Sequence, residues 1–275
     1  MHKIRIGKSK IEYEVPARWE ELTADQLEFL ARLSLNGSPV WRICLMMALY
    51  CIGAKVVPGY HIWPHRKDLV KLMIGNKYHY VGTEYVAQLG ALFSWLVTKE
   101  EKEGTPTYKI LANVDKCPYP HIQVKDFILD GPADGMLDIC FEQYMYIHTF
   151  VQQMQHDPTK ITYVIACVWH SGERWDIERL EQDAALIARL SDDKKIVMMW
   201  FIQSALIFFS DKFPRLFGGA KSKGGNAFDY QMRLLDSLAD GDMTKKDAVR
   251  RGSLMDAFYS MDEAVRKKEE MERKR

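Results

Sequence analysis

Polar and apolar residues alternate at the beginning of the chain. Ile4 and Ile6 are separated by a polar residue, and residues 11–15 repeat the alternation after the segment GKSK. A period of two is typical of strands that bury one face. This pattern predicts a small β-hairpin that ends at Pro16.

The pattern then changes to the spacing of helices. Thr23 and Gln26 have the spacing of a capping box, which predicts a helix start at Thr23. Ser38-Pro39 predicts a second start, because a serine cap is followed by proline at the first helical position. This second helix is apolar on almost every side and is expected in a core. A further helix is predicted over residues 83–98 and a strand over residues 107–114.

The second half of the chain repeats this order. An amphipathic helix is followed by Asp157-Pro158, which supplies the same cap and proline as Ser38-Pro39. A long, turn-rich connection is predicted over residues 117–135, and helices over residues 175–190 and after Ser191. Two interpretations of the repeated order stay open: a weak internal duplication, or two buried helical hairpins that look alike.

The segment FGGAKSKGGN, residues 217–226, contains the residue types of a phosphate-binding loop. Such a loop requires GxxxxGK[ST], so that a lysine and a hydroxyl reach the phosphates. Counted from Gly219, these two positions are occupied by Gly225 and Asn226. The segment is therefore interpreted as a linker.

These patterns predict a mainly α fold with two helical lobes, a small N-terminal β-hairpin and a C-terminal helical appendage. The expected divisions are residues 1–116 for the hairpin and first lobe, 117–217 for the second lobe, 218–226 for the linker and 227–275 for the appendage. The last helix carries an apolar stripe that suits docking on a partner or on a neighbouring copy. The stripe consists of Leu254, Phe258, Met261 and Val265. Alternatively, it folds back onto the chain's own lobes.

Composition narrows the class of partner. There are 38 basic and 37 acidic residues, and the formal charge of +1 provides no global field to attract DNA, RNA or an acidic membrane. Five cysteines, an odd number set mostly in apolar runs, predict free thiols in a reducing compartment. The most apolar window, residues 196–209, is shorter than a membrane span of about 20 residues. A cytoplasmic protein is the expectation.

The sequence contains no catalytic signature. GxSxG, HExxH and GxGxxG motifs do not occur. Pro64 lies between His61 and His65 and argues against a helix that would bring both histidines to one metal. Asp240-Gly241-Asp242 lacks the later glycine and glutamate of a calcium loop. No catalytic residue, cofactor or metal ligand is therefore predicted.

Two alternative functions stay open. A thiol- or metal-dependent enzyme would use the second lobe around Cys167, His148 and His170, although the apolar neighbours of Cys167 predict an inert thiol. A nucleic-acid adaptor would use the local concentrations of basic residues. These residues are Lys221, Lys223, Lys245, Lys246, Arg250 and Arg251. Acidic neighbours favour a solvated helix face instead.

Four segments resemble tail assembly chaperone-like and virion structural proteins of phages and prophages of Bacteroidetes-type bacteria. The segments are WEELTADQLEFLARL (19–33), GPADGMLDICFEQYMYIHTF (131–150), ERWDIERLEQDAALIARLSDDKK (173–195) followed by FPRLF (213–217), and LADGDMTKKDAVRRGSLMDAF (238–258). The last one is similar to the C-terminal part of tail assembly chaperones, where an LA-x-G-D-x-T-K-x-D turn leads into a charged helix.

The resemblance implies a non-enzymatic role in building a phage tail or virion through contacts with other virion proteins. A tail assembly chaperone would bind the tape-measure protein and keep its apolar helices soluble until the tail tube forms. The expected location is the cytoplasm of the bacterial host, or the virion itself. A homo-oligomer is compatible with this role.

Overall fold

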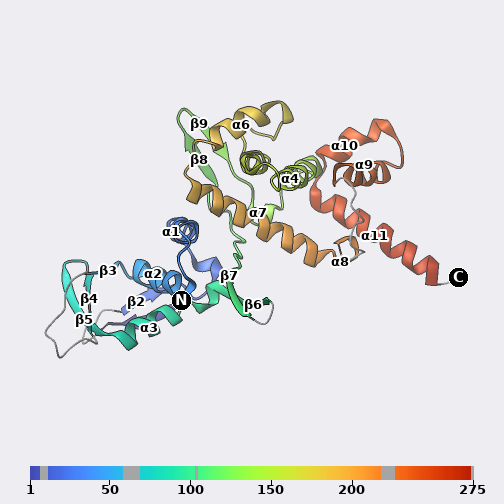
Figure 1. Cartoon of the computed structure of the whole chain (residues 1–275). Coiled ribbons are helices and arrows are strands. Elements are labelled where there is room, and N and C mark those ends of the chain that lie inside the picture. Colours follow the sequence, from blue (N-terminus) through green and yellow to red (C-terminus); the bar gives the residue numbers. More distant parts are fainter. Residues whose placement is uncertain (7–11, 58–68, 103–104, 218–226, 274–275) are drawn as a thin grey trace. The chain divides into compact units, whose positions relative to one another are not determined.

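The computed structural model describes residues 1–6, 12–57, 69–102, 105–217 and 227–273 (Figure 1). Helices dominate these residues, which confirms the predicted mainly α class, and short antiparallel strand pairs lie between them. The chain forms two compact units, Met1–Asn113 and Val114–Arg275.

The first unit combines three α-helices with small sheets. Its elements are β1 (His2–Arg5), β2 (Glu12–Val15), η1 (Trp19–Glu21), α1 (Ala24–Leu35), α2 (Val40–Cys51), β3 (Ala54–Val56), β4 (Leu69–Ile74), β5 (Lys77–Gly82), α3 (Thr83–Ala91), η2 (Ser94–Leu96), β6 (Val97–Lys102) and β7 (Thr105–Ile110). β1 pairs with β2 as predicted, and Ile4 lies opposite Tyr13. The residues that connect these two strands lie outside the described part of the chain. β3, β4 and β5 form a separate antiparallel sheet.

Local signals place the first two helices. The Gln26 amide donates to Thr23 Oγ1 at 3.3 Å, and the Gln26 side chain accepts from the Thr23 amide at 3.0 Å, so the predicted capping box is present. The prediction of Ser38 as the cap of α2 is wrong. Pro39 holds that position, and its carbonyl accepts from the amides of Arg42 and Ile43. α2 lies in the core, as its apolar surface predicts.

The predicted helix over residues 83–98 ends early. α3 stops at Ala91, because Phe93 and Leu96 become fully buried in a tighter turn. Val97 then begins β6, where it lies opposite Ile110 of β7. β-Branched residues favour such a paired strand over a continued helix.

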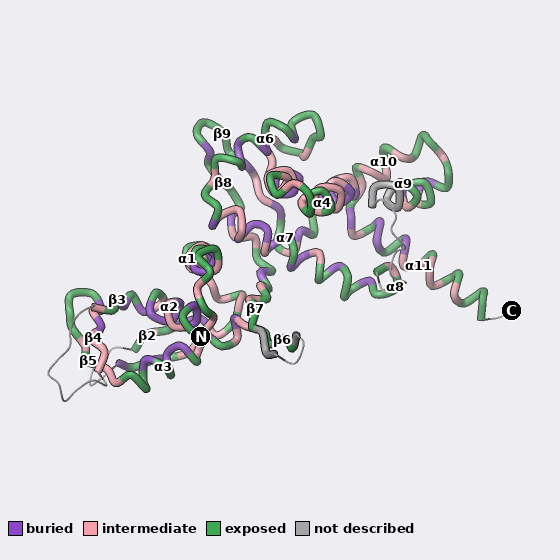
Figure 2. Tube along the Cα trace, viewed as in Figure 1, coloured by how far each residue is buried: buried purple, intermediate pink, exposed green. Residues whose placement is uncertain are grey.

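The second unit is built around α4 and α7. Its elements are β8 (His121–Val124), β9 (Phe127–Asp130), η3 (Asp134–Met136), α4 (Phe141–Gln153), η4 (Pro158–Lys160), α5 (Ile161–Ala166), η5 (Ile177–Arg179), α6 (Leu180–Ile187), α7 (Asp192–Lys212), α8 (Pro214–Phe217), α9 (Ala227–Leu238), η6 (Met243–Lys245), α10 (Lys246–Arg251) and α11 (Leu254–Arg273). Buried positions recur along α4 and α7, whereas the last turns of α11 are exposed (Figure 2).

Two predictions about the second unit can be compared with its elements. Asp157 caps the start of η4 by accepting from the Thr159 amide at 3.0 Å, with Pro158 in the first position as predicted. The turn-rich connection over residues 117–135 contains a regular strand pair that the sequence analysis missed. In this pair Ile122 lies opposite Leu129, and both side chains are buried.

The division into units differs from the predicted divisions in two respects. The boundary lies after Asn113 rather than after residue 116, and the helices of residues 227–273 belong to the same unit as the second lobe. α9 and α10 pack on α4, and α11 packs on α8. The predicted linker, residues 218–226, lies outside the described residues. Within the described part of the chain, no helix is long and apolar enough to cross a membrane.

Candidate functional site

The apolar stripe of the last helix is covered by its own unit. Leu254, Phe258 and Met261 are buried, and Val265 is half-buried. Phe258 is surrounded by four aromatic rings of the same unit, those of Tyr144, Phe209, Phe213 and Phe217. The structure therefore assigns the stripe to the core of this unit, which was the alternative left open by the sequence. Partner binding through these residues stays a prediction.

The candidate enzyme residues are in buried surroundings. Cys167 is fully buried, and burial raises the pKa of its thiol well above the ordinary value. Burial lowers the pKa of His148 to about 4 and also lowers the pKa of His170, so both imidazoles are neutral at pH 7. Among the described residues, no group of three or more His, Cys, Asp or Glu side chains is arranged to hold a metal ion.

The candidate nucleic-acid residues have acidic neighbours. Lys246 Nζ lies 2.6 Å from Asp236 Oδ1, and Lys245 Nζ lies 3.8 Å from Asp242 Oδ2. Arg250 is 3.6 Å from Asp247. Arg251 is exposed, and Lys221 and Lys223 lie outside the described residues. These carboxylates offset the positive field that a phosphate backbone would require.

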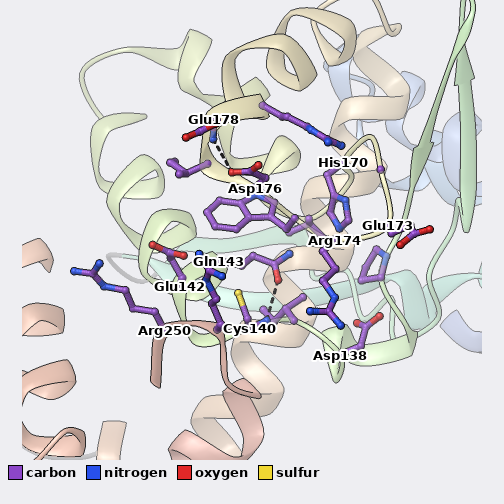
Figure 3. A pocket seen from close by; sticks show the side chains of 18 of the residues that line it. Asp138, Cys140, Glu142, Gln143, His170, Glu173, Arg174, Asp176, Glu178 and Arg250 are labelled. Atoms are coloured by element: carbon purple, nitrogen blue, oxygen red, sulfur yellow. Dashed lines mark hydrogen bonds between the residues drawn. The ribbon is translucent and has the colours of Figure 1, made fainter. Parts of the chain in front are cut away.

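The second unit contains an open cavity of 1180 Å³ (Figure 3). Its walls come from the approach to α4 and its first turn, from the segment between α5 and α6, and from α10. This volume exceeds the range of about 300–1,000 Å³ that is usual for small-molecule pockets. The cavity therefore offers room for a larger group, such as a segment of polypeptide.

Charged side chains of both signs line the cavity. The six acidic residues are Asp138, Glu142, Glu173, Asp176, Glu178 and Asp247, and the four arginines are Arg174, Arg179, Arg250 and Arg251. The formal charge of this set is −2. A lining of both signs suits a ligand that also carries both signs, and it does not favour a polyanion.

Backbone hydrogen bonds connect the start of α11 to the cavity wall. The Phe141 amide donates to the Gly252 carbonyl at 3.0 Å, and the Leu254 amide donates to the Ile139 carbonyl at 3.1 Å. Ile139 and Cys140 belong to the lining. This bridge between Cys140 and Ser253 brings α10 and its arginines to the cavity although they lie far along the chain.

Gln143 joins two walls of the cavity. Its side-chain carbonyl accepts from the Cys140 amide at 2.8 Å, and its amide donates to the Cys167 carbonyl at 2.8 Å. Gln143 is buried, so both bonds are shielded from water. Like Gln26 at the start of α1, it occupies the third helical position of a capping box. The start of α4 is thereby fixed against the end of α5.

The segment between α5 and α6 is held by polar contacts. Ser171 donates its hydroxyl to Asp183 at 2.7 Å and its amide at 3.1 Å. Arg179 donates to the Ser171 carbonyl at 3.1 Å and passes directly over Gly172, where a Cβ atom would occupy the same space. Gly172 has a φ of +95°, so glycine is required there for its backbone as well.

Two buried polar atoms at the cavity have no hydrogen-bond partner in the described structure. They are Trp175 Nε1 and His170 Nδ1. An unpaired buried polar group costs about 1–3 kcal/mol, so these two atoms reduce the stability of this part of the fold. Arg174 also has no hydrogen bond or ion pair with a described residue. In Figure 3 its side chain extends past His170 toward Asp138.

Sequence reasoning found only part of this lining. His170, Arg250 and Arg251 were assigned to two different hypotheses, and the structure brings them to one cavity. Arg174 and Trp175 were missed. The signal for them is the segment SGERWD, residues 171–176, in which a tryptophan stands among charged residues between two helices. Tryptophan and arginine in such surroundings are enriched at protein interfaces.

The cavity contains no activated nucleophile among the residues described. Cys140 is the thiol in its lining, and burial raises its pKa above the ordinary value. A thiol that stays protonated at pH 7 is a poor nucleophile.

The chain is mainly α-helical, and its second unit contains a polar cavity lined by charges of both signs. No family model, curated protein or solved structure matches this chain.

A pH prediction follows from His148. Its ring packs against Tyr144 at 4.4 Å, and its Nε2 atom is buried without a partner among the described residues. The unfolded imidazole binds a proton near pH 6.5, whereas the folded one does so only near pH 4. The second unit should therefore lose about 3 kcal/mol of stability as the pH falls from 6.5 to 4.

The His148→Leu variant should lack this part of the pH dependence. Urea unfolding of both proteins at pH 7 and pH 4.5 measures it, because other titrating groups contribute equally to each. His156→Leu is the control, since His156 is exposed. An equal loss of stability in the wild type and in His148→Leu would contradict the prediction.

Proposed function

We propose that this chain is a non-enzymatic phage tail assembly or virion structural protein that acts by protein–protein contact. The observation that supports it most directly is the cavity of the second unit, with its volume of 1180 Å³ and its lining of both charge signs. Its lining suits a polypeptide surface. The resemblance of four chain segments to tail assembly and virion structural proteins supplies the biological setting.

The cysteine environments support contact over thiol chemistry. Burial raises the pKa of Cys117 to about 11 and of Cys51 to about 12, and it also raises the pKa of Cys44, Cys140 and Cys167. Thiols of this kind are protonated and unreactive at neutral pH. Iodoacetamide labelling of the native protein is expected to be slow at each of them.

The charge distribution supports a protein partner over a nucleic acid. Acidic residues outnumber arginines in the cavity lining. Within residues 245–251, most of the basic side chains lie within 4 Å of a carboxylate. A phosphate backbone would meet repulsion there. In the finer form of the proposal, the partner is a tape-measure protein or another tail component, met in the host cytoplasm or in the virion.

Co-expression with the neighbouring tail genes tests this proposal. A tagged form of the chain is expected to retain at least one tail component, the tape-measure protein in particular, through purification. An unrelated protein with the same tag is the control. Each sample is treated with nuclease before elution, because retention that depends on nucleic acid would indicate the adaptor function instead. Retention of no tail component would overturn the proposal.

A further inference from the structure

The end of α11 is an exposed helical segment of mixed charge. Residues 270–273 are all exposed, and Met271 retains 63% of its accessible surface. Lys268, Glu272 and Arg273 have no hydrogen bond or ion pair with any described residue. Residues 266–273 contain four basic and three acidic side chains, a formal charge of +1. The segment therefore presents unpaired charges and one apolar side chain to a partner.

The direction of α11 is fixed by contacts on its middle turns. Arg215 of α8 lies 3.1 Å from Asp262 and 3.8 Å from Glu269. Before them, Phe258 and Met261 are buried in the core of the unit. Figure 1 shows α11 as one continuous helix that leads away from α10. The packed middle turns of α11 therefore fix the direction in which its exposed last turns extend.

The cavity lies at the opposite end of the same helix. Leu254, the first residue of α11, bonds to Ile139 of the cavity wall. α11 contains 20 residues. A rise of 1.5 Å per residue places its far end about 30 Å from its start. The end of α11 therefore does not reach the cavity of its own chain, and only another copy can bring it there.

The charges of the two surfaces are complementary. The cavity has a formal charge of −2, and residues 266–273 at the end of α11 have a formal charge of +1. Glu142, Glu173 and Glu178 of the lining have no side-chain ion pair within the described chain, and neither has Arg174. The unpaired Lys268 and Arg273 match the glutamates, and Glu272 matches the arginine. Met271 offers a soft apolar side chain to the Trp175 ring, a favourable sulfur–aromatic contact.

We propose that the end of α11 from one copy of this chain occupies the cavity of a second copy. The two surfaces are different, so the contact is head-to-tail and repeats to give a ring or a filament. This inference rests on the proposed function in one respect, since it takes the cavity as a protein-binding site. It adds the occupant of the cavity and the geometry of assembly.

Complementary variants test the proposal by sedimentation of the purified protein. The tail variant carries Lys268→Glu and Arg273→Glu, and the cavity variant carries Glu173→Lys and Glu178→Lys. All four side chains are exposed, so the fold is expected to persist and circular dichroism checks it. The wild type should associate with rising concentration, and each variant at least about tenfold more weakly. Glu181→Lys on α6 makes the same type of charge change outside the lining and should associate as the wild type does.

Mixing the two variants distinguishes this contact from others. The wild-type tail of the cavity variant fits the wild-type cavity of the tail variant, and the exchanged tail fits the exchanged cavity. An equimolar mixture should therefore form long assemblies in which the two variants alternate. Placing all four changes in one chain should restore long assemblies, because the exchanged charges are again complementary. A wild type that stays monomeric, or a mixture that behaves like its components, overturns the proposal.

The outcome separates this inference from the proposed function. If the chain is monomeric yet retains a tail component, the self-assembly inference fails and the proposed function stands. If the cavity variant also loses that component, the occupant of the cavity is the tail protein rather than a second copy. If the chain assembles as expected but retains no tail component, the proposed function fails.

Discussion

Phe258→Ala is expected to destabilise the second unit by about 3–5 kcal/mol, the range for truncating a fully buried phenylalanine. The Phe258 side chain is 1% exposed. Its ring lies 5.0 Å from Tyr144, 5.7 Å from Phe209 and 5.3 Å from Phe213, at tilted or edge-on angles that favour aromatic pairs. Alanine would remove these contacts and leave a cavity between α11, α4 and α7.

Urea unfolding monitored by circular dichroism measures the loss. Tyr259→Ala is the matched control, because it truncates the adjacent aromatic residue, which is 54% exposed. The control should cost about 1 kcal/mol or less. Equal losses in the two variants would mean that α11 is not packed on the body as described.

Hydrogen exchange adds a local measurement to the same variant. α10 and α11 are joined to the cavity wall next to Phe141, and Phe258 is the main buried anchor of α11. Amides of residues 246–261 should therefore exchange faster in Phe258→Ala, while those of α6 keep their protection. Unchanged exchange over residues 246–261 would contradict this role of Phe258.

Gly131→Ala is expected to destabilise the second unit by about 3–5 kcal/mol through overpacking and loss of a buried hydrogen bond. A Cβ atom on Gly131 would lie 2.5 Å from Trp169 Nε1 and 2.5 Å from the Tyr119 carbonyl oxygen. These two atoms form a buried hydrogen bond of 2.8 Å. Trp169 is fully buried, so neither partner has room to move away.

Thermal unfolding of Gly131→Ala against Ala133→Val checks this expectation. Ala133 follows in the same loop and is exposed in an extended backbone, so its added bulk should change stability by about 0.5 kcal/mol or less. A Gly131→Ala protein as stable as this control would show that the backbone does not pass as close to Trp169 as the structure places it.

Elements with strong local signals were predicted well. The capping box of Thr23 and Gln26, the alternation of β1 and β2, and the apolar surface of α2 each act within a few neighbouring residues. Short strands were predicted poorly. The strand pair near Ile122 and the end of α3 at Ala91 depend on pairing with other segments, which a reading of local periodicity does not contain.

The candidate site was less predictable than the fold. Its lining comes from segments far apart in the chain, and its most informative features are unpaired atoms such as Trp175 Nε1. Whether a polar atom has a partner depends on every element packed around it. The sequence pattern predicted that Arg250 and Arg251 lie on a solvated helix face. This pattern contains no information that His170, far away in the chain, lines the same cavity.

The sequence by itself determined the mainly α class, most helix starts and the existence of an apolar stripe on the last helix, because helical period and capping are local properties. Only the tertiary structure decided what covers that stripe and where the cavity forms. The backbone hydrogen bond from Leu254 to Ile139 holds the start of α11 against the cavity wall. It therefore contributes both to the covering of the stripe and to the shape of the cavity. Such a bridge depends on the summed packing of Phe258 and its aromatic neighbours, so it arises only when the whole unit is folded.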